Sequence, residues 1–177
     1  MNSRARPTEF ECSHVKQYPS RPMPSTKKSK IIDSAPYRLA AKTRVIYGDT
    51  DCMGVVYHGS YIRYMEHARV EAMRNLGVSY AGMERMGVGL PVTELSIKYL
   101  APGRYDDFVS LWVALLRVSW ARLHFSYELV VEAGDREGLT ERQILARGET
   151  HHGCMALSDK RATKMPDEVY TRLIAEV

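Results

Sequence analysis

The chain has 177 residues, of which 45% are hydrophobic and 26% charged, and its formal net charge is +4. This length suits one domain with a core of its own and leaves little room for a second. No apolar run is long enough to cross a bilayer, and the first residues lack the apolar stretch of a secretory signal, so we expect a cytoplasmic protein without a membrane span.

The charge is unevenly distributed along the chain. Residues 1–44 contain ten Lys or Arg and three Asp or Glu, a balance of +7, whereas the remaining residues have a balance of −3. We therefore expect no nucleic-acid-binding face on the folded part. Five of the eight prolines also lie within residues 1–36. Because proline interrupts helices and sheet ladders, we predict a flexible, basic, proline-rich extension over residues 1–36 and a single domain over residues 37–177.

The first strand is predicted over residues 37–47, where β-branched and aromatic residues are concentrated. A polar connection punctuated by glycines follows over residues 48–59. Apolar residues then recur at steps of three and four, which predicts a long helix with Ser60 as its N-cap and Gly77 as its left-handed stop. Residues 79–86 predict a second, short helix.

The rest of the chain is rich in strand signals. Four consecutive strands are predicted, at residues 88–100, 108–118, 122–132 and 143–157, and a terminal helix is expected to open at Pro166. In the third of these strands one face is apolar, formed by Leu123, Phe125, Tyr127 and Leu129. Consecutive strands joined by short turns pair antiparallel, so we predict a four-strand meander. The fold class is α+β, a curved antiparallel sheet wrapped around one long helix, with a partner subunit covering the part of the sheet left open.

The cysteines and histidines give no sign of a bound metal. Cys12, Cys52 and Cys154 are odd in number and far apart, which argues against a disulfide framework and against a metal site. His151 and His152 are adjacent in a predicted strand, so their side chains point to opposite faces and cannot share one ion. No third ligand has a suitable spacing, and we expect no metal and no other cofactor.

The segment with the richest chemistry is residues 47–61, which link the first strand to the long helix. Asp49, Asp51 and His58 fall within ten residues, beside glycines that permit unusual backbone angles. The helix start adds unpaired N–H groups and a partial positive charge. Such donors can hold a developing oxyanion while a carboxylate attacks or activates water, so the segment is suited to acyl transfer.

The string Asp-Thr-Asp-Cys-Met-Gly-Val-Val-Tyr-His at residues 49–58, followed by Tyr61, resembles the signature of the 4-hydroxybenzoyl-CoA thioesterase family. It is closest to the bacterial branch of that family associated with the Tol–Pal envelope system. Glu66-His67-Ala68-Arg69 and the stretch at residues 99–107 are also similar to that branch. The resemblance covers roughly residues 38–175 and implies the hotdog fold, which agrees with the order of elements predicted above.

The resemblance also implies an activity and a site. The activity is hydrolysis of acyl-CoA thioesters to free acid and CoA, with Asp51 as nucleophile or general base and His58 assisting at the thioester. Amides at the helix start would form the oxyanion hole. The remaining substrate-binding positions would be Gly54, Val56, Tyr57 and Glu66. The family further implies a homodimer or homotetramer with sites shared between subunits, and acyl carrier protein is the alternative carrier of the acyl group.

Other interpretations of these residues remain open. Asp51 could be a loop aspartate that accepts a hydrogen bond from its own backbone. Asp49 is expected to shape the loop or to pair with a basic group. Glu66 could orient a neighbour inside the site or merely pair with a cation on the helix surface.

Two other functions also remain open. The same fold could be a non-catalytic module that binds acyl-CoA or acyl carrier protein, because fold does not fix function. Asp49 and Asp51 could instead belong to an Asp-x-Asp phosphohydrolase. That enzyme class needs a parallel sheet of alternating strands and helices, which the consecutive strands predicted here do not provide.

Overall fold

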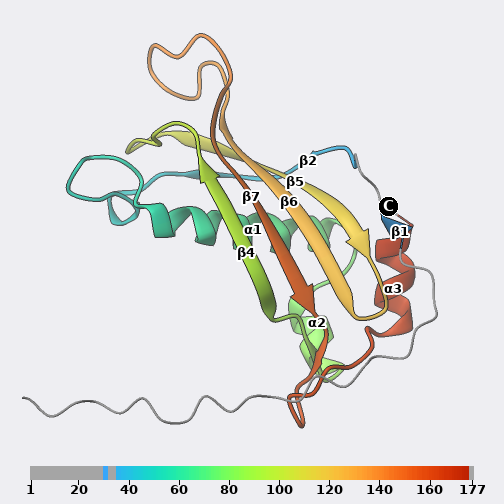
Figure 1. The fold of residues 1–177 in the computed structure, drawn as a ribbon. Coiled ribbons are helices and arrows are strands. Elements are labelled where there is room, and N and C mark those ends of the chain that lie inside the picture. Colours follow the sequence, from blue (N-terminus) through green and yellow to red (C-terminus); the bar gives the residue numbers. More distant parts are fainter. Residues whose placement is uncertain (1–29, 32–34, 176–177) are drawn as a thin grey trace, which may run out of the picture.

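The computed structural model describes residues 30–31 and 35–175, which form a six-stranded antiparallel sheet with a long helix across one of its faces, and a separate two-stranded sheet (Figure 1). The helix is α1 (His58–Asn75). The strands of the sheet are β1 (Lys30–Ile31), β2 (Arg38–Arg44), β4 (Val92–Tyr99), β5 (Phe108–Val118), β6 (Arg122–Val131) and β7 (Gln143–Gly153). The smaller elements are the 3-10 turn η1 (Tyr47–Asp49), α2 (Tyr80–Arg85), β3 (Val88–Gly89), β8 (Met155–Ala156) and α3 (Asp167–Ile174). The predicted α+β class is confirmed.

The order of strands corrects one prediction. The sheet runs β1-β5-β6-β7-β4, and β2 also pairs with β5. The predicted meander is therefore wrong, because β4 does not lie beside β5 but pairs with β7. β5 is already bonded to β6 on one side and to β2 and β1 on the other, so it offers β4 no free edge. Residues 100–107 carry the chain across the end of the sheet from β4 to β5.

The first strand is shorter than predicted. β2 ends at Arg44, and the next residues leave the sheet to form η1. The cause is local, because the Asp49 carboxylate accepts a hydrogen bond from the Ile46 N–H at 3.2 Å, which competes with the ladder. Lys30–Ile31, within the predicted extension, form β1 on the edge of β5 beyond the part that β2 occupies. Residues 35–36 of the predicted extension are also described, and its residues 1–29 and 32–34 lie outside the described residues.

The long helix begins three residues earlier than predicted. Tyr57 is the N-cap, and Ser60 lies inside the first turn, where its hydroxyl donates to the Asp49 carbonyl at 3.1 Å. The predicted cap at Ser60 is therefore wrong, because its hydroxyl holds the preceding loop instead of the helix amides. The end of the helix is as predicted, since Gly77 follows the C-cap with φ of +73°.

The core lies between α1 and the inner face of the sheet. The apolar face predicted for β6 is confirmed, because its four residues are at most 1% exposed (Leu123, Phe125, Tyr127 and Leu129). α1 approaches β7 closely at Gly148, where an added Cβ would lie 2.7 Å from the Met65 methyl group. The helices of the described residues are all too short or too polar to cross a membrane.

The core also contains a buried polar chain. Tyr127 and Thr150 share a hydrogen bond of 2.7 Å between their hydroxyls, and His152 Nε2 lies 2.8 Å from the Thr150 hydroxyl. Arg69 of α1 lies over the Tyr80 ring, 4.8 Å from its centroid. Burial, assisted by the positive charge of Arg69, lowers the pKa of His152 to about 4, so this histidine is neutral at physiological pH. His151 is on the opposite face of β7, as predicted.

Candidate functional site

An open hollow of about 350 Å³ lies at the start of α1. Two segments far apart in the chain form it: the loop before α1 with the first turn of that helix, and the end of β4 with the three residues after it. Its lining residues are Asp51, Met53, Val55, Val56, His58, Tyr61, Tyr99, Leu100, Ala101 and Pro102. The structure therefore brings three of the predicted site residues, Asp51, Val56 and His58, to one surface.

A tight turn sets the position of Asp51. Its N–H donates to the Val55 carbonyl at 2.9 Å, and its carbonyl accepts from the Gly54 N–H at 3.0 Å. Gly54 has φ of +72°, a left-handed conformation that favours glycine. The half-buried Asp51 carboxylate accepts one backbone bond, from the Met53 N–H to Oδ1 at 2.8 Å. Oδ2 has no hydrogen-bond partner among the described residues, so one oxygen is held and the other is free.

Asp49, two residues earlier, has a different environment. It is only 3% exposed, and its carboxylate binds the Arg63 guanidinium and accepts from the Tyr64 hydroxyl at 2.7 Å. Its carbonyl accepts from the Tyr57 N–H at 2.8 Å and from the Ser60 hydroxyl. Asp49 thus ties η1 to the first turn of α1 and pairs with a basic group, which is the structural role expected of it.

The helix start supplies donors at the rim of the hollow. Within the described part of the chain, the backbone N–H groups of His58 and Gly59 donate to no other residue, as is common in the first turn of a helix. The helix dipole adds partial positive charge there. The exposed His58 ring lies 4.1 Å from the Tyr57 ring, and the His58 carbonyl accepts from the Tyr99 hydroxyl at 3.1 Å.

Close packing clamps the far wall of the hollow onto α1. The Gly103 N–H donates to the Tyr61 hydroxyl at 3.1 Å, and the Gly103 carbonyl accepts from the Val56 N–H at 2.9 Å. A Cβ at Gly103 would lie 2.8 Å from a Val56 methyl, so only glycine fits without rearrangement. Sequence reasoning assigned no role to residues 99–102, although the stretch at 99–107 was part of the resemblance.

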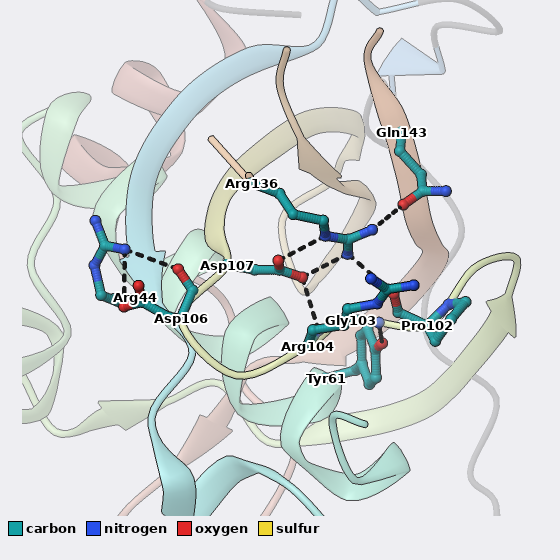
Figure 2. A network of polar contacts seen from close by, with 9 residues as sticks. All are labelled: Arg44, Tyr61, Pro102, Gly103, Arg104, Asp106, Asp107, Arg136 and Gln143. Carbon is teal, nitrogen blue, oxygen red and sulfur yellow. Dashed lines mark hydrogen bonds and ion pairs between the residues drawn. The ribbon is translucent and has the colours of Figure 1, made fainter. Parts of the chain in front are cut away.

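A buried ion pair between Asp107 and Arg136 holds the segment that contains Pro102 in place (Figure 2). Asp107 is 1% exposed and accepts two bonds from the Arg136 guanidinium, at 2.7 and 2.6 Å. The same carboxylate accepts from the Arg104 N–H at 2.7 Å. Arg136 also donates to the Gln143 side-chain oxygen at 2.6 Å and to the Pro102 carbonyl at 3.1 Å. The position of Pro102 in the hollow therefore depends on a fully bonded pair outside it.

The other predicted substrate-binding residues do not line the hollow. Gly54 and Tyr57 are next to lining residues, in the turn and at the N-cap of α1. Glu66 is exposed and lies two turns further along the helix, about 12 Å from His58. A hollow with a partly free carboxylate, an imidazole and free amides can polarise a carbonyl group and deliver a nucleophile to it.

Comparison with known proteins places the chain among enzymes that act on thioesters. Residues 45–173 match the thioesterase-like superfamily. The chain is 30% identical over 124 residues to the 1,4-dihydroxy-2-naphthoyl-CoA hydrolase of Thermosynechococcus vestitus, covering 70% of this chain and 80% of that protein. It is 34% identical over 87 residues to the acyl-CoA thioester hydrolase YbgC of Escherichia coli, covering 49% of this chain and 65% of that protein. The crystal structure of the DHNA-CoA thioesterase of Staphylococcus aureus is similar with a TM-score of 0.67 at 29% identity, covering 78% of this chain and 91% of that one.

Proposed function

The chain belongs to the thioesterase-like superfamily, and we propose from this that it hydrolyses acyl-CoA thioesters to a free acid and CoA at the hollow beside Asp51. One observation carries the proposal. A half-buried carboxylate with a free oxygen lines the same open surface as His58, at a helix start whose first amides are unpaired. The sheet is antiparallel throughout, which leaves the phosphohydrolase alternative without the parallel scaffold it needs.

The proposed chemistry uses groups on both sides of the thioester. The N–H groups of His58 and Gly59 polarise the carbonyl and hold the oxyanion that forms, and the His58 ring assists. In one route an Asp51 oxygen attacks the carbonyl carbon, the C–S bond breaks, CoA leaves as the thiolate, and water then hydrolyses the mixed anhydride. In the other route water attacks the carbonyl carbon, Asp51 takes its proton, and the departing thiolate later receives it.

Isotopic labelling tests for the anhydride route. A single turnover in ¹⁸O-labelled water, with enzyme in excess, is followed by mass spectrometry of the peptide that contains Asp51. Label in the Asp51 carboxylate supports the anhydride route with attack of water on the Asp51 carbonyl carbon. Label confined to the product acid is expected from the general-base route and also from attack of water on the acyl carbon of the anhydride. An Asp51→Asn variant with an unchanged rate would remove Asp51 from both.

Gly54, Val56, Tyr57 and Glu66 are proposed to contact the substrate. Val56 lines the hollow, and Gly54 and Tyr57 border it. Glu66 is exposed on α1, eight residues after His58, which places it about 12 Å along the helix and about 80° around its axis from His58. A pantetheine arm that crosses this part of α1 would meet Glu66 far from the reacting carbon. Glu66→Gln is therefore expected to raise KM and leave kcat unchanged, and an equal fall in kcat would contradict this assignment.

We propose that a homodimer, alone or paired into a tetramer, completes the site. β4 bonds to β7 on one side and to no strand of the described residues on the other, and such an edge is a template for pairing. Exposed apolar side chains border the hollow, among them Met53 at 76% exposure and Leu100 at 45%. Sedimentation velocity across a dilution series tests this, because hydrolysis per chain should fall as the oligomer dissociates. A monomer with full activity would contradict a shared site.

The acyl group and its carrier are open to direct test. The relatives are named for an aromatic naphthoyl-CoA in one case and for acyl-CoA in the other. A hydrolysis panel of aliphatic chain lengths and one aromatic thioester, each on CoA and on acyl carrier protein, identifies the preferred class. Tight binding of every acyl-CoA without turnover would favour the binding module. A cytoplasmic location and the Tol–Pal-associated branch remain predictions.

A further inference from the structure

A cluster of metal-ligating side chains lies on the outer face of the sheet, which is turned away from α1. His124 of β6 and His151 of β7 are paired in the register, and their rings stack with centroids 3.9 Å apart and an interplanar angle of 19°. The Glu149 carboxylate of β7 comes within 2.9 Å of His124 Nε2. All three residues are half-buried. One potential ligand atom from each lies within 4.8 Å of the others.

We propose that His124, Glu149 and His151 bind a divalent transition-metal ion, for which zinc is the best match. Two imidazoles and one carboxylate are a ligand set that zinc uses, with bonds of about 2.0–2.2 Å to nitrogen and oxygen. Ligands at that distance around a tetrahedral ion are roughly 3.3 Å apart. To share one ion, the ligand atoms must come closer together and the two stacked rings must tilt so that a nitrogen of each faces the ion. Calcium and magnesium fit poorly, because they prefer oxygen ligands.

The strand scaffold gives the cluster its geometry. Residues opposite each other on neighbouring antiparallel strands, and residues two apart on one strand, share a face of the sheet. His124 and His151 satisfy the first relation, and Glu149 and His151 the second. On the neighbouring edge strand β4, Glu94 is also paired with His151. This second carboxylate is available on the same face, with water as the other candidate for the fourth ligand.

Basic neighbours on the same face oppose a cation. Arg117 of β5 is paired with His124, on the side of β6 away from His151. Arg122 is two residues before His124 on β6, whereas Arg147, two residues before Glu149 on β7, is paired with Glu128. Glu149 and Glu94 balance the charges of Arg117 and Arg122, so the affinity should be lower than that of a site with no basic neighbour.

The site is independent of the hollow beside Asp51. Glu94, opposite His151, is five residues before Tyr99 on β4, about 16 Å along the strand, and the hollow lies at the end of the strand. The metal would connect β6 and β7 without contact with substrate. Binding should therefore raise the thermal midpoint and leave hydrolysis unchanged.

Calorimetric titration of the chelator-treated full chain with zinc tests the proposal. The expected result is one zinc per chain, a raised thermal midpoint, and an affinity at least tenfold lower in His124→Ala and in His151→Ala. His67→Ala is the matched control, since His67 is an exposed histidine on α1, and its affinity should equal that of the unmodified chain. If either alanine variant fails to fold by circular dichroism, Glu149→Gln replaces it, because that side chain is half-exposed and keeps its shape.

Zinc located by anomalous diffraction between His124 and His151 would support the site. Failure to bind zinc at millimolar concentration would overturn it. An affinity that is unchanged in His151→Ala, or is lost in Cys52→Ser, would also overturn it, because the metal would then occupy another group such as the exposed Cys52 thiol.

Discussion

Asp51 and Asp107 are both connected to the hollow at the start of α1, but their surroundings differ. Asp51 is half-exposed, accepts one backbone bond and keeps an oxygen free. Asp107 is buried, and both of its oxygens are occupied by Arg136 and the Arg104 amide. The hollow thus presents unpaired polar groups such as Asp51. The residues behind it, Asp107 and Arg136, form the supporting wall, and their polar groups are bonded to one another. Changes in the first region should lower the rate and spare stability, whereas changes in the second should lower stability.

The largest effect is expected for Asp51→Asn. Loss of the nucleophile or general base should lower kcat/KM for acyl-CoA by about 10²–10⁴-fold, which is about 2.7–5.5 kcal/mol of activation free energy. The amide keeps the oxygen that accepts from Met53, so the free energy of unfolding should change by less than about 0.5 kcal/mol. Steady-state kinetics and urea denaturation of the same preparation measure both.

Asp159→Asn is the control for this variant, because Asp159 is exposed in a turn beyond β8 and does not line the hollow. It should hydrolyse acyl-CoA at the unmodified rate. A large loss of stability in Asp51→Asn would contradict the division between free and supporting groups, even if the rate also fell.

Asp107→Ala tests the support. It would leave the Arg136 guanidinium, whose side chain is only 12% exposed, without its carboxylate partner. Breaking a buried pair in this way costs about 3–5 kcal/mol of unfolding free energy. The neighbouring Asp106→Asn is the control, since Asp106 pairs with Arg44 at the surface and should lose less than about 1 kcal/mol. Equal losses in urea denaturation would show that burial of the pair does not matter.

The contrast between these aspartates explains what the sequence could predict. Asp51, Val56 and His58 come from one continuous segment, so a local pattern indicated them. Asp107 and Arg136 are 29 residues apart and meet only because residues 100–107 cross the end of the sheet. That crossing follows from the pairing of β4 with β7, which strand patterns could not predict because each strand has the same alternation whichever neighbour it pairs with. The face of β6 and the end of α1 at Gly77 were predicted correctly because both depend on local spacing and backbone conformation.

The outer-face cluster shows the same limit. His151 and His152 were correctly expected to point to opposite faces, yet the partners of His151 could not be found by spacing along the chain. His124 is 27 residues earlier and becomes a neighbour only through the register of β6 with β7. The N-cap was misplaced for a different reason. Ser60 has the side chain of a cap, but its hydroxyl bonds to the Asp49 carbonyl, a contact that the loop alone determines.

Asp49→Asn allows a buried, paired aspartate to be compared with Asp51, which lies two residues later in the same loop. The buried carboxylate holds Arg63 and Tyr64, and an amide of the same shape would lose its charge-assisted bonds. The expected loss is about 1.5–3 kcal/mol of unfolding free energy. Asp49 would then affect stability, although it lies in the same loop as Asp51, which is expected to affect the rate. Denaturation midpoints of the two variants measured side by side should separate them. A variant as stable as the unmodified chain would mean that the Asp49 charge does not hold the loop.

The smallest effect is expected from the buried core residue His152, through the loss of stability at low pH. Burial and the charge of Arg69 lower the pKa of His152 to about 4, whereas in the unfolded chain it returns to about 6.5. Between these values the unfolded state binds more protons, so stability is complete above pH 6.5 and falls as the pH drops towards 4. Between pH 7 and pH 5 protonation linked to His152 should lower the free energy of unfolding by about 2 kcal/mol. His152→Gln, which keeps hydrogen-bonding groups but does not titrate, should flatten that part of the stability profile, while the exposed His67→Gln should leave it steep. A profile equally steep in His152→Gln would assign the acid sensitivity to other groups, and the buried chain from Tyr127 to His152 would then contribute to packing without contributing to the pH response.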